Sequence, residues 1–87
     1  MKKITRVKND LGMHARPAGV IAELAMEAKN EIHLCVHSDR VDATNIIDIL
    51  TLGAVKGTKV VIEIENQDDV TVLNDIIEFF EAGFGEI

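Results

Sequence analysis

Apolar and polar side chains alternate in several short stretches of the chain, and a two-residue period is typical of strands that bury one face. In the clearest stretch, 31–37, one face would carry Ile32, Leu34 and Val36, and the other would carry His33, Cys35 and His37. Residues 2–8 also carry β-branched side chains, and residues 59–65 alternate again, with Val60, Ile62 and Ile64 facing inward. The pattern predicts four strands, over residues 2–8, 31–37, 40–42 and 59–65.

The stretch 17–29 instead repeats its apolar residues every three to four positions, as an amphipathic helix does. Its apolar stripe would comprise Ala18, Ile21, Ala25 and Ala28, with Leu24 beside it. Glu23 and Glu27 would lie on the opposite side of the helix. Pro17 fits the first turn, because a proline there lacks only a donor that the helix would leave unpaired.

A short second helix is predicted over 45–52, with Thr44 or Asn45 as its N-cap. Gly53 suits the left-handed position that ends such a helix. Just before it, Ser38-Asp39 has the composition of a tight reversal between two strands. Strands joined by a tight hairpin must be antiparallel, so at least part of the sheet is antiparallel.

A third helix is predicted to begin near Asp68 or Asp69, whose carboxylates favour a helix N-terminus, and to end at Gly83. Its buried residues would be Leu73, Ile76, Ile77 and Phe80. The element order is therefore β-α-β-β-α-β-α. One small sheet with the helices packed on one face accommodates this order, which predicts a single α+β two-layer domain over residues 1–87.

Nine basic and fifteen acidic residues give a formal net charge of −6. This acidic balance argues against non-specific nucleic-acid binding and against docking on anionic lipid, since both require a basic surface. Cys35 is the only cysteine, so no internal disulfide can form. The N-terminus lacks the apolar segment of a signal peptide, and no apolar run approaches the roughly 18 residues of a membrane span. We expect a cytoplasmic protein.

The candidate chemistry lies in the segment 11–18, where His14 stands at the start of the first predicted helix. A helix N-terminus offers unpaired N–H donors and a partial positive charge, which favour a bound phosphate and a neutral imidazole. A neutral imidazole is a competent nucleophile, and Arg16 could stabilise a transferred phosphoryl group. A histidine at this position can equally be only a helix cap, with the arginine solvated.

Residues 12–18, Gly-Met-His-Ala-Arg-Pro-Ala, resemble the active-site signature of HPr, the histidine-containing phosphocarrier family of the phosphoenolpyruvate-dependent phosphotransferase system. Residues 29–32 and 51–58 resemble further segments of that family. The resemblance implies an open-faced sandwich, a four-stranded antiparallel sheet under three helices. It also implies that His14 accepts a phosphoryl group on Nδ1 from Enzyme I and passes it to an enzyme IIA. Arg16 would stabilise the phosphate, and no cofactor would be needed.

The resemblance further implies a partner-binding surface on the second helix, which would comprise Met13, Ile46, Ile47, Leu50 and Gly53. An exposed aliphatic patch on so acidic a protein is consistent with a docking site. The alternative is that some of these residues belong to the core. That is the expectation for Ile49, and for Ile47 and Leu50 the two interpretations are evenly balanced.

Three positions depart from the family pattern. Many members carry a regulatory serine, phosphorylated by an ATP-dependent kinase, where this chain has Asn45, which cannot accept that phosphate. Glu23 and Glu27 occupy positions that are often neutral or basic in members. They favour a partner with a basic surface and are consistent with a specialised paralogue, for example one in a nitrogen-related phosphotransferase chain.

Other groupings of chemical residues have simpler explanations. Residues two positions apart on a strand lie about 6–7 Å from each other, and a structural zinc site usually needs four ligands. His33, Cys35 and His37 therefore predict a partly exposed sheet face and no metal site. The acidic residues Glu63, Glu65, Asp68 and Asp69 are most simply a solvated face and a preference for acidic side chains at a helix start.

Three functions compete at this point. The first is a covalent phosphocarrier, a transfer intermediate rather than a free-standing enzyme. The second is a regulatory binding module that docks on a transcriptional regulator or an enzyme, with the state of His14 as a signal. The third is a small metabolite-binding domain of the ferredoxin-like kind, which would need a pocket at a subunit interface. A monomer is the default expectation.

Overall fold

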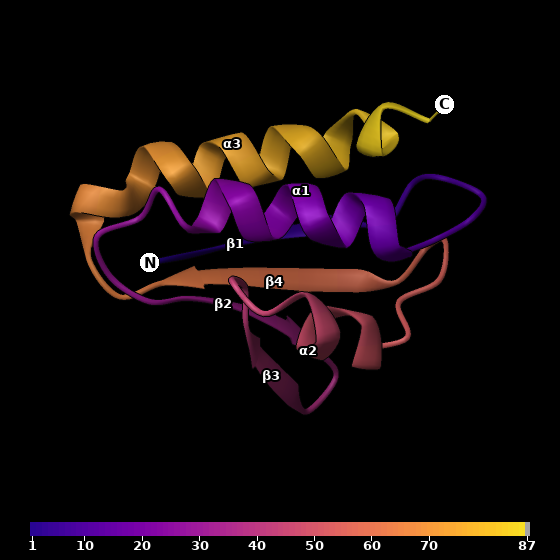
Figure 1. Ribbon diagram of the computed structural model, residues 1–87, viewed down its shortest axis with the longest axis horizontal. Coiled ribbons are helices and arrows are strands. Elements are labelled where there is room, and N and C mark those ends of the chain that lie inside the picture. The colour runs from indigo at the N-terminus through magenta and orange to yellow at the C-terminus, as the bar shows by residue number, and fades with distance from the viewer. Residues whose placement is uncertain (87) are drawn as a thin grey trace.

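The computed structural model describes residues 1–86 and gives the predicted order of strands and helices (Figure 1). The elements are β1 (Lys2–Arg6), α1 (Ala15–Ala25), β2 (Ile32–Val36), β3 (Asp39–Asp42), α2 (Ile46–Thr51), β4 (Lys59–Ile64) and α3 (Val70–Glu81). Short 3-10 turns at Gln67–Asp69 and Gly83–Gly85 precede and follow α3.

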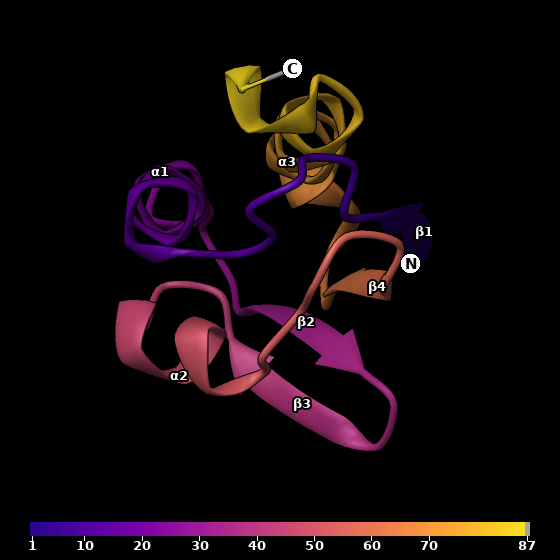
Figure 2. The same ribbon diagram turned by 90° about the vertical axis from the view of Figure 1, so that its right-hand side faces the viewer.

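The four strands form one antiparallel sheet in the order β1-β4-β2-β3. In β4, Val61 pairs with Ile4 of β1 on one side, and Ile62 pairs with Leu34 of β2 on the other. The end-on view in Figure 2 shows the three helices on one side of the sheet and no element over its other face. The predicted open-faced α+β sandwich is thus confirmed.

The core lies between the sheet and the helices and is almost entirely aliphatic. The strands contribute inward residues at alternate positions, and the helices contribute one stripe each; the largest completely buried side chains include Ile21, Ile32, Leu34, Ile49, Ile62, Leu73, Ile76 and Phe80. Burying one such side chain stabilises the fold by about 1.5–3 kcal/mol. The expectation that Ile49 belongs to the core is therefore correct.

Most element boundaries differ from the sequence expectation by one or two residues, and the end of α1 differs by four. α1 begins at Ala15 and ends at Ala25, whereas 17–29 was expected, because His14 already takes the cap position. β1 ends at Arg6 rather than at residue 8. The hairpin reverses at His37 and Ser38, one residue earlier than predicted, and His37 is not part of the strand. A two-residue hairpin loop requires a positive φ, and His37 adopts φ 54°.

The prediction that Asp69 lies on a solvated face was wrong, because this residue is only 2% exposed. Its carboxylate accepts hydrogen bonds from the backbone N–H of Lys29 at 2.8 Å and of Asn30 at 2.9 Å. These bonds tie the loop after α1 to the start of α3. They also hold the pKa of Asp69 below its usual range, with the Lys29 amide as the main cause. Asn66 caps the preceding turn instead, by accepting from the Asp68 amide at 2.8 Å.

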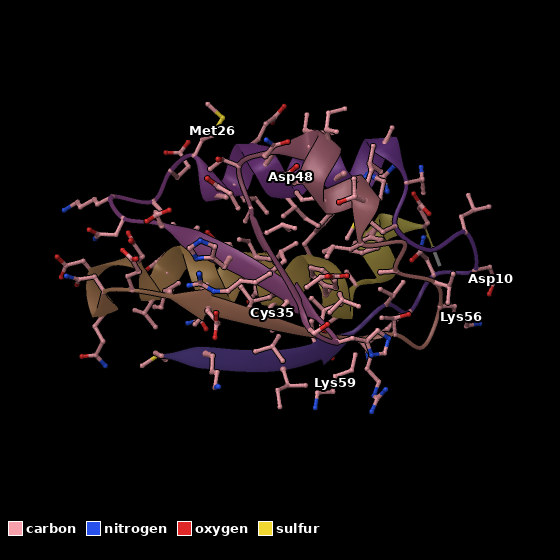
Figure 3. The ribbon with its side chains drawn as sticks, turned by 90° about the horizontal axis from the view of Figure 1, so that it is seen from below. Asp10, Met26, Cys35, Asp48, Lys56 and Lys59 are labelled. Carbon is pink, nitrogen blue, oxygen red and sulfur yellow. The ribbon has the colours of Figure 1, made fainter. Side chains whose placement is uncertain are left out.

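The open face of the sheet carries a polar network around Cys35, which Figure 3 shows at the centre of that face. The Sγ of Cys35 donates to Glu63 Oε1 at 3.4 Å, and Arg40 Nε donates to the same oxygen at 2.9 Å. Partial burial and the Glu63 carboxylate raise the pKa of the Cys35 thiol. Within residues 1–86, no group of three His, Cys, Asp or Glu side chains is arranged to hold a metal ion. None of the helices described is long and apolar enough to cross a bilayer.

Replacing Asp69 by asparagine should lower the Tm by several degrees at pH 7, because an amide can accept from one of the two backbone N–H groups but not satisfy both as a carboxylate does. The folded-state pKa is depressed, so this stabilisation is complete above the unfolded-state pKa of about 3.9 and is lost as the pH falls below it. D69N should therefore also flatten the acid limb of the stability curve. Thermal unfolding between pH 2 and 7 measures both effects.

The matched control is Asp68→Asn, which makes the same chemical change at an exposed neighbouring position. D68N should leave the Tm nearly unchanged. Equal Tm values for D68N and D69N across the pH range would contradict the structural role assigned to Asp69.

Candidate functional site

The loop before α1 packs against the loop that follows α2, and this contact determines where α1 begins. Asn9 is buried and closes the loop, since its Nδ2 donates to the Gly12 carbonyl at 2.9 Å. The Met13 amide then donates to the Ala54 carbonyl, also at 2.9 Å. Gly12 has φ +72°, and a Cβ on it would lie 2.9 Å from the Ala54 oxygen. Only glycine therefore fits at this point of closest approach.

His14 is the N-cap of α1, with extended backbone angles of φ −130° and ψ −173°. Its carbonyl accepts the first hydrogen bond of the helix, from the Ala18 amide at 3.1 Å. The N–H groups of Ala15 and Arg16 precede that bond, so no carbonyl of the helix uses them. The His14 side chain makes no capping hydrogen bond. With 37% of that side chain exposed, the ring stands at the positive end of the helix and is accessible to solvent.

The carboxylate of Glu86, from the far end of the chain, joins the two predicted site residues. Its Oε2 lies 2.7 Å from His14 Nε2, 2.6 Å from Arg16 Nη2 and 3.1 Å from Arg16 Nε. Its Oε1 accepts from Asn9 Nδ2 at 2.7 Å. The Glu86 side chain is only 18% exposed. The Arg16 hydrogen bonds, followed by those from Asn9 and His14, lower the pKa of Glu86 to about 2.

The turn after α3 brings Glu86 to this place. Gly83 leaves the helix with φ +61°, and Phe84 follows with φ +58° and is 1% exposed. The Phe84 ring packs against Phe79 and Phe80, with ring centroids 5.1 Å and 4.9 Å apart. Its carbonyl accepts a further hydrogen bond from Arg16 Nη2. In Figure 1 the yellow C-terminal turn lies at the same end of the molecule as the loop that enters α1.

Chemically, this arrangement is an oxyanion site between an imidazole and a guanidinium at a helix N-terminus. All the groups around the Glu86 carboxylate that the structure describes are hydrogen-bond donors, and one of them is a permanent cation. The imidazole offers a nucleophilic nitrogen, and the other groups can stabilise negative charge on whatever it attacks.

The residues expected on the partner surface differ in exposure. Ile47 is 69% exposed and Ile46 42% exposed, whereas Leu50 and Met13 are half-buried. Gly53 is exposed and has the positive φ expected at the end of α2. Asn45 caps α2 as expected, since its Oδ1 accepts from the Asp48 amide at 3.0 Å.

The structure also reveals residues that sequence reasoning missed. Leu11 is 75% exposed and Val55 67% exposed, in the two loops that meet at Gly12. Beside them, Lys56 and Asp10 form an ion pair of 2.7 Å that links the same loops (Figure 3). Glu86 was missed altogether. The available signal was the phenylalanine between Gly83 and Gly85, since an apolar residue flanked by glycines after a helix indicates a chain that turns back onto the core.

Comparisons with known proteins place this chain beside phosphocarriers. Residues 1–82 match the family model described as the phosphorylation site of the PTS HPr component. The chain is 36% identical over 81 residues to phosphocarrier protein HPr of Chlamydia pneumoniae, covering 93% of this chain and 75% of that protein. It is 36% identical over 87 residues to phosphocarrier protein NPr of Klebsiella oxytoca, covering 99% and 97%.

Among solved structures, an HPr from Thermoanaerobacter tengcongensis superposes with a TM-score of 0.92 and 28% sequence identity. The match covers 100% of this chain and 98% of that chain. The agreement over the full length supports the strand and helix arrangement described above.

Replacing Gly12 by alanine should destabilise the protein by more than the roughly 1–2 kcal/mol expected for a positive φ alone, because the new methyl group would also meet the Ala54 carbonyl. The matched control is Gly53→Ala, where φ is +60° but the Cβ would point into open space. Chemical denaturation of both variants measures the difference. Equal losses of stability would contradict the close approach of the two loops.

Proposed function

The chain belongs to the HPr family of the phosphotransferase system, and from this premise we propose that His14 takes a phosphoryl group from Enzyme I and passes it to an enzyme IIA. Family membership extends over nearly the whole chain. Enzyme I, the enzyme IIA and the sugar route are parts of the proposal, as is the role of each site residue.

The observation that carries the proposal is the oxyanion already held between His14 and Arg16. The Glu86 carboxylate lies within hydrogen-bond distance of both side chains, which places the Arg16 guanidinium close enough to the ring to bind an anionic group attached to it. A phosphoryl group bound to the His14 ring would bring three such oxygens to the same guanidinium and the same helix end.

The transfer step follows from these groups. The lone pair of His14 Nδ1 attacks phosphorus and forms the N–P bond, while the bond between phosphorus and the donor on Enzyme I breaks and the donor keeps its electron pair. The charge of the transferred group is then stabilised by Arg16 and by the N-terminal amides of α1. Transfer to the next protein is the same displacement in the other direction. The chain itself needs no cofactor for either step.

A carrier must dock on proteins that supply the rest of each active site, and the apolar patch beside His14 supports this requirement. The patch comprises Met13, Ile46, Ile47 and Leu50, extended by Leu11 and Val55. Exposed aliphatic residues grouped around a reactive side chain are typical of a transient protein interface.

A second candidate is a specialised phosphotransferase chain, for example a nitrogen-related one, in place of sugar uptake. Glu23 on α1 and Glu27 in the turn that follows the helix are both exposed. Such a surface favours a partner with compensating basic residues. The rates of phosphorylation by Enzyme I proteins from a sugar chain and from a nitrogen chain, measured side by side, discriminate between the two routes.

Incubation with phosphoenolpyruvate and Enzyme I should add one acid-labile phosphoryl group to the protein, detected by mass spectrometry. His14→Ala should abolish the adduct, and Arg16→Ala should slow its formation on the order of a hundredfold, because a cation near the developing charge is lost. His37→Ala, a change at an exposed histidine of the hairpin, is the control and should react normally. An adduct that persists in H14A would refute the proposed acceptor.

Replacing Ile47 by aspartate should raise the KM of Enzyme I for this protein by roughly tenfold, with little change in kcat, because the apolar patch is lost while His14 is untouched. Met26→Asp is the matched control, since Met26 is 71% exposed and lies at the opposite end of α1. A KM that rises equally in both variants would mean that the patch around Ile47 is not the docking surface.

A further inference from the structure

The hydrogen bond between His14 and Glu86 distinguishes the two nitrogens of the imidazole ring. A neutral imidazole carries one proton, and the nitrogen without a proton holds the lone pair that attacks. Nε2 lies 2.7 Å from Glu86 Oε2, whereas Nδ1 has no hydrogen-bond partner among residues 1–86. An ionised carboxylate can only accept a hydrogen bond, so the atom that faces it must be the protonated nitrogen.

From this geometry we infer that Glu86 is a positioning residue, which keeps the proton on Nε2 of His14 and leaves the lone pair on Nδ1 for attack on phosphorus. The inference rests on the proposed function and adds a residue to it. Under this inference, contacts within this chain determine which ring nitrogen of His14 attacks phosphorus, and the partner protein is not needed to select it.

The surroundings of Glu86 keep it in the form that this role requires. Arg16 and Asn9 hold the carboxylate from two further sides, and the side chain is mostly shielded from water. With a pKa of about 2, the carboxyl group is ionised over the whole range in which the protein would work. The donors from Asn9 and Arg16 also fix the direction from which Glu86 meets the ring.

The same carboxylate affects the energy of the transfer. When Nδ1 forms its bond to phosphorus and Nε2 keeps its proton, the ring acquires a positive charge. Glu86 then lies in contact with that charge and stabilises the cation, as a buried aspartate does for the histidine of a serine protease triad. In the reverse step the N–P bond breaks, the electron pair returns to Nδ1 and the ring is again neutral.

Arg16 can bind the Glu86 carboxylate and an incoming phosphoryl group at the same time. Its Nε and Nη2 donate to Glu86, and its Nη2 also donates to the Phe84 carbonyl, but Nη1 has no partner among the residues described. A guanidinium has five N–H donors in a flat fork, so an incoming phosphoryl oxygen can bind Nη1 while Glu86 stays in place.

The test uses phosphoramidate, a small phosphoryl donor that reacts with imidazole without a partner protein. Full-length wild type, Glu86→Gln and Glu81→Gln are labelled with ¹⁵N and phosphorylated, and the phosphorylated nitrogen of His14 is assigned by ¹⁵N and ³¹P NMR. Glu81 is the matched control, because it is a hydrogen-bonded glutamate near the end of α3 whose partners are Thr5 and Lys8. The unphosphorylated ring is assigned in the same samples.

Wild type and E81Q should give mainly the Nδ1 product, with Nε2 protonated in the free ring. In E86Q the glutamine amide can accept from Nε2 or donate to it, so the ratio of Nδ1 to Nε2 product should fall roughly tenfold. The same ratio and the same ring ¹⁵N shifts in wild type and E86Q would overturn the inference. A fall of equal size in E81Q would overturn it too, because the effect would then be general.

A circular dichroism spectrum and a Tm for E86Q establish that the comparison is made on folded protein, and the ring ¹⁵N shifts report on the proton position even where the phosphorylation yield is low. Failure of the proposed function has a different signature. In that case Enzyme I and phosphoenolpyruvate leave His14 of wild type unmodified, while the phosphoramidate products of wild type and E86Q still differ.

Discussion

The contact on which the site depends is the meeting of one carboxylate with an imidazole and a guanidinium. Glu86 bridges His14 and Arg16, and Asn9 holds its second oxygen. This junction joins the start of α1 to the turn that follows α3, so the orientation of the His14 ring depends on contacts between distant segments of the chain and not on the short motif alone. The helix dipole and the Glu86 carboxylate have electrostatic effects of opposite sign. The helix end favours a bound anion, and Glu86 favours positive charge on the ring.

The two layers of the sandwich carry different kinds of exposed residues. The helix layer carries His14 and the exposed apolar residues of α2, and its buried residues attach it to the sheet. The opposite face of the sheet carries Cys35 in a network with Glu63 and Arg40, and the raised pKa of the thiol makes it a hydrogen-bond donor there rather than a nucleophile.

The periodicity of the sequence was sufficient for the element order and the two-layer α+β class, because both depend on local alternation or on a local apolar stripe. The fully antiparallel four-stranded sheet was implied only by the family resemblance, since a hairpin fixes the direction of no more than two strands. The reversal at His37 was missed by one residue, since histidine is not a usual residue for a positive φ. Asp69 and Glu86 were missed for another reason. Their partners are Lys29 and Asn30 for the first and His14 and Arg16 for the second, and they lie far away in the sequence. Phe84 between two glycines indicates that the chain turns back onto the core, but no local pattern specifies which residues it then meets.

The sheet order has a consequence for how the protein matures on the ribosome. β1 is made first, but it pairs with β4, so Lys2 must wait for Glu63 to emerge before the first strand has any neighbour. The helix that bears His14 is likewise synthesised long before Glu86. A partly synthesised chain therefore holds the His14 segment with no complete sheet beneath it and no Glu86 carboxylate beside it. Under the proposed function, competence for phosphoryl transfer requires both the insertion of β1 beside β4 and the docking of Glu86, and such long-range contacts form late in folding.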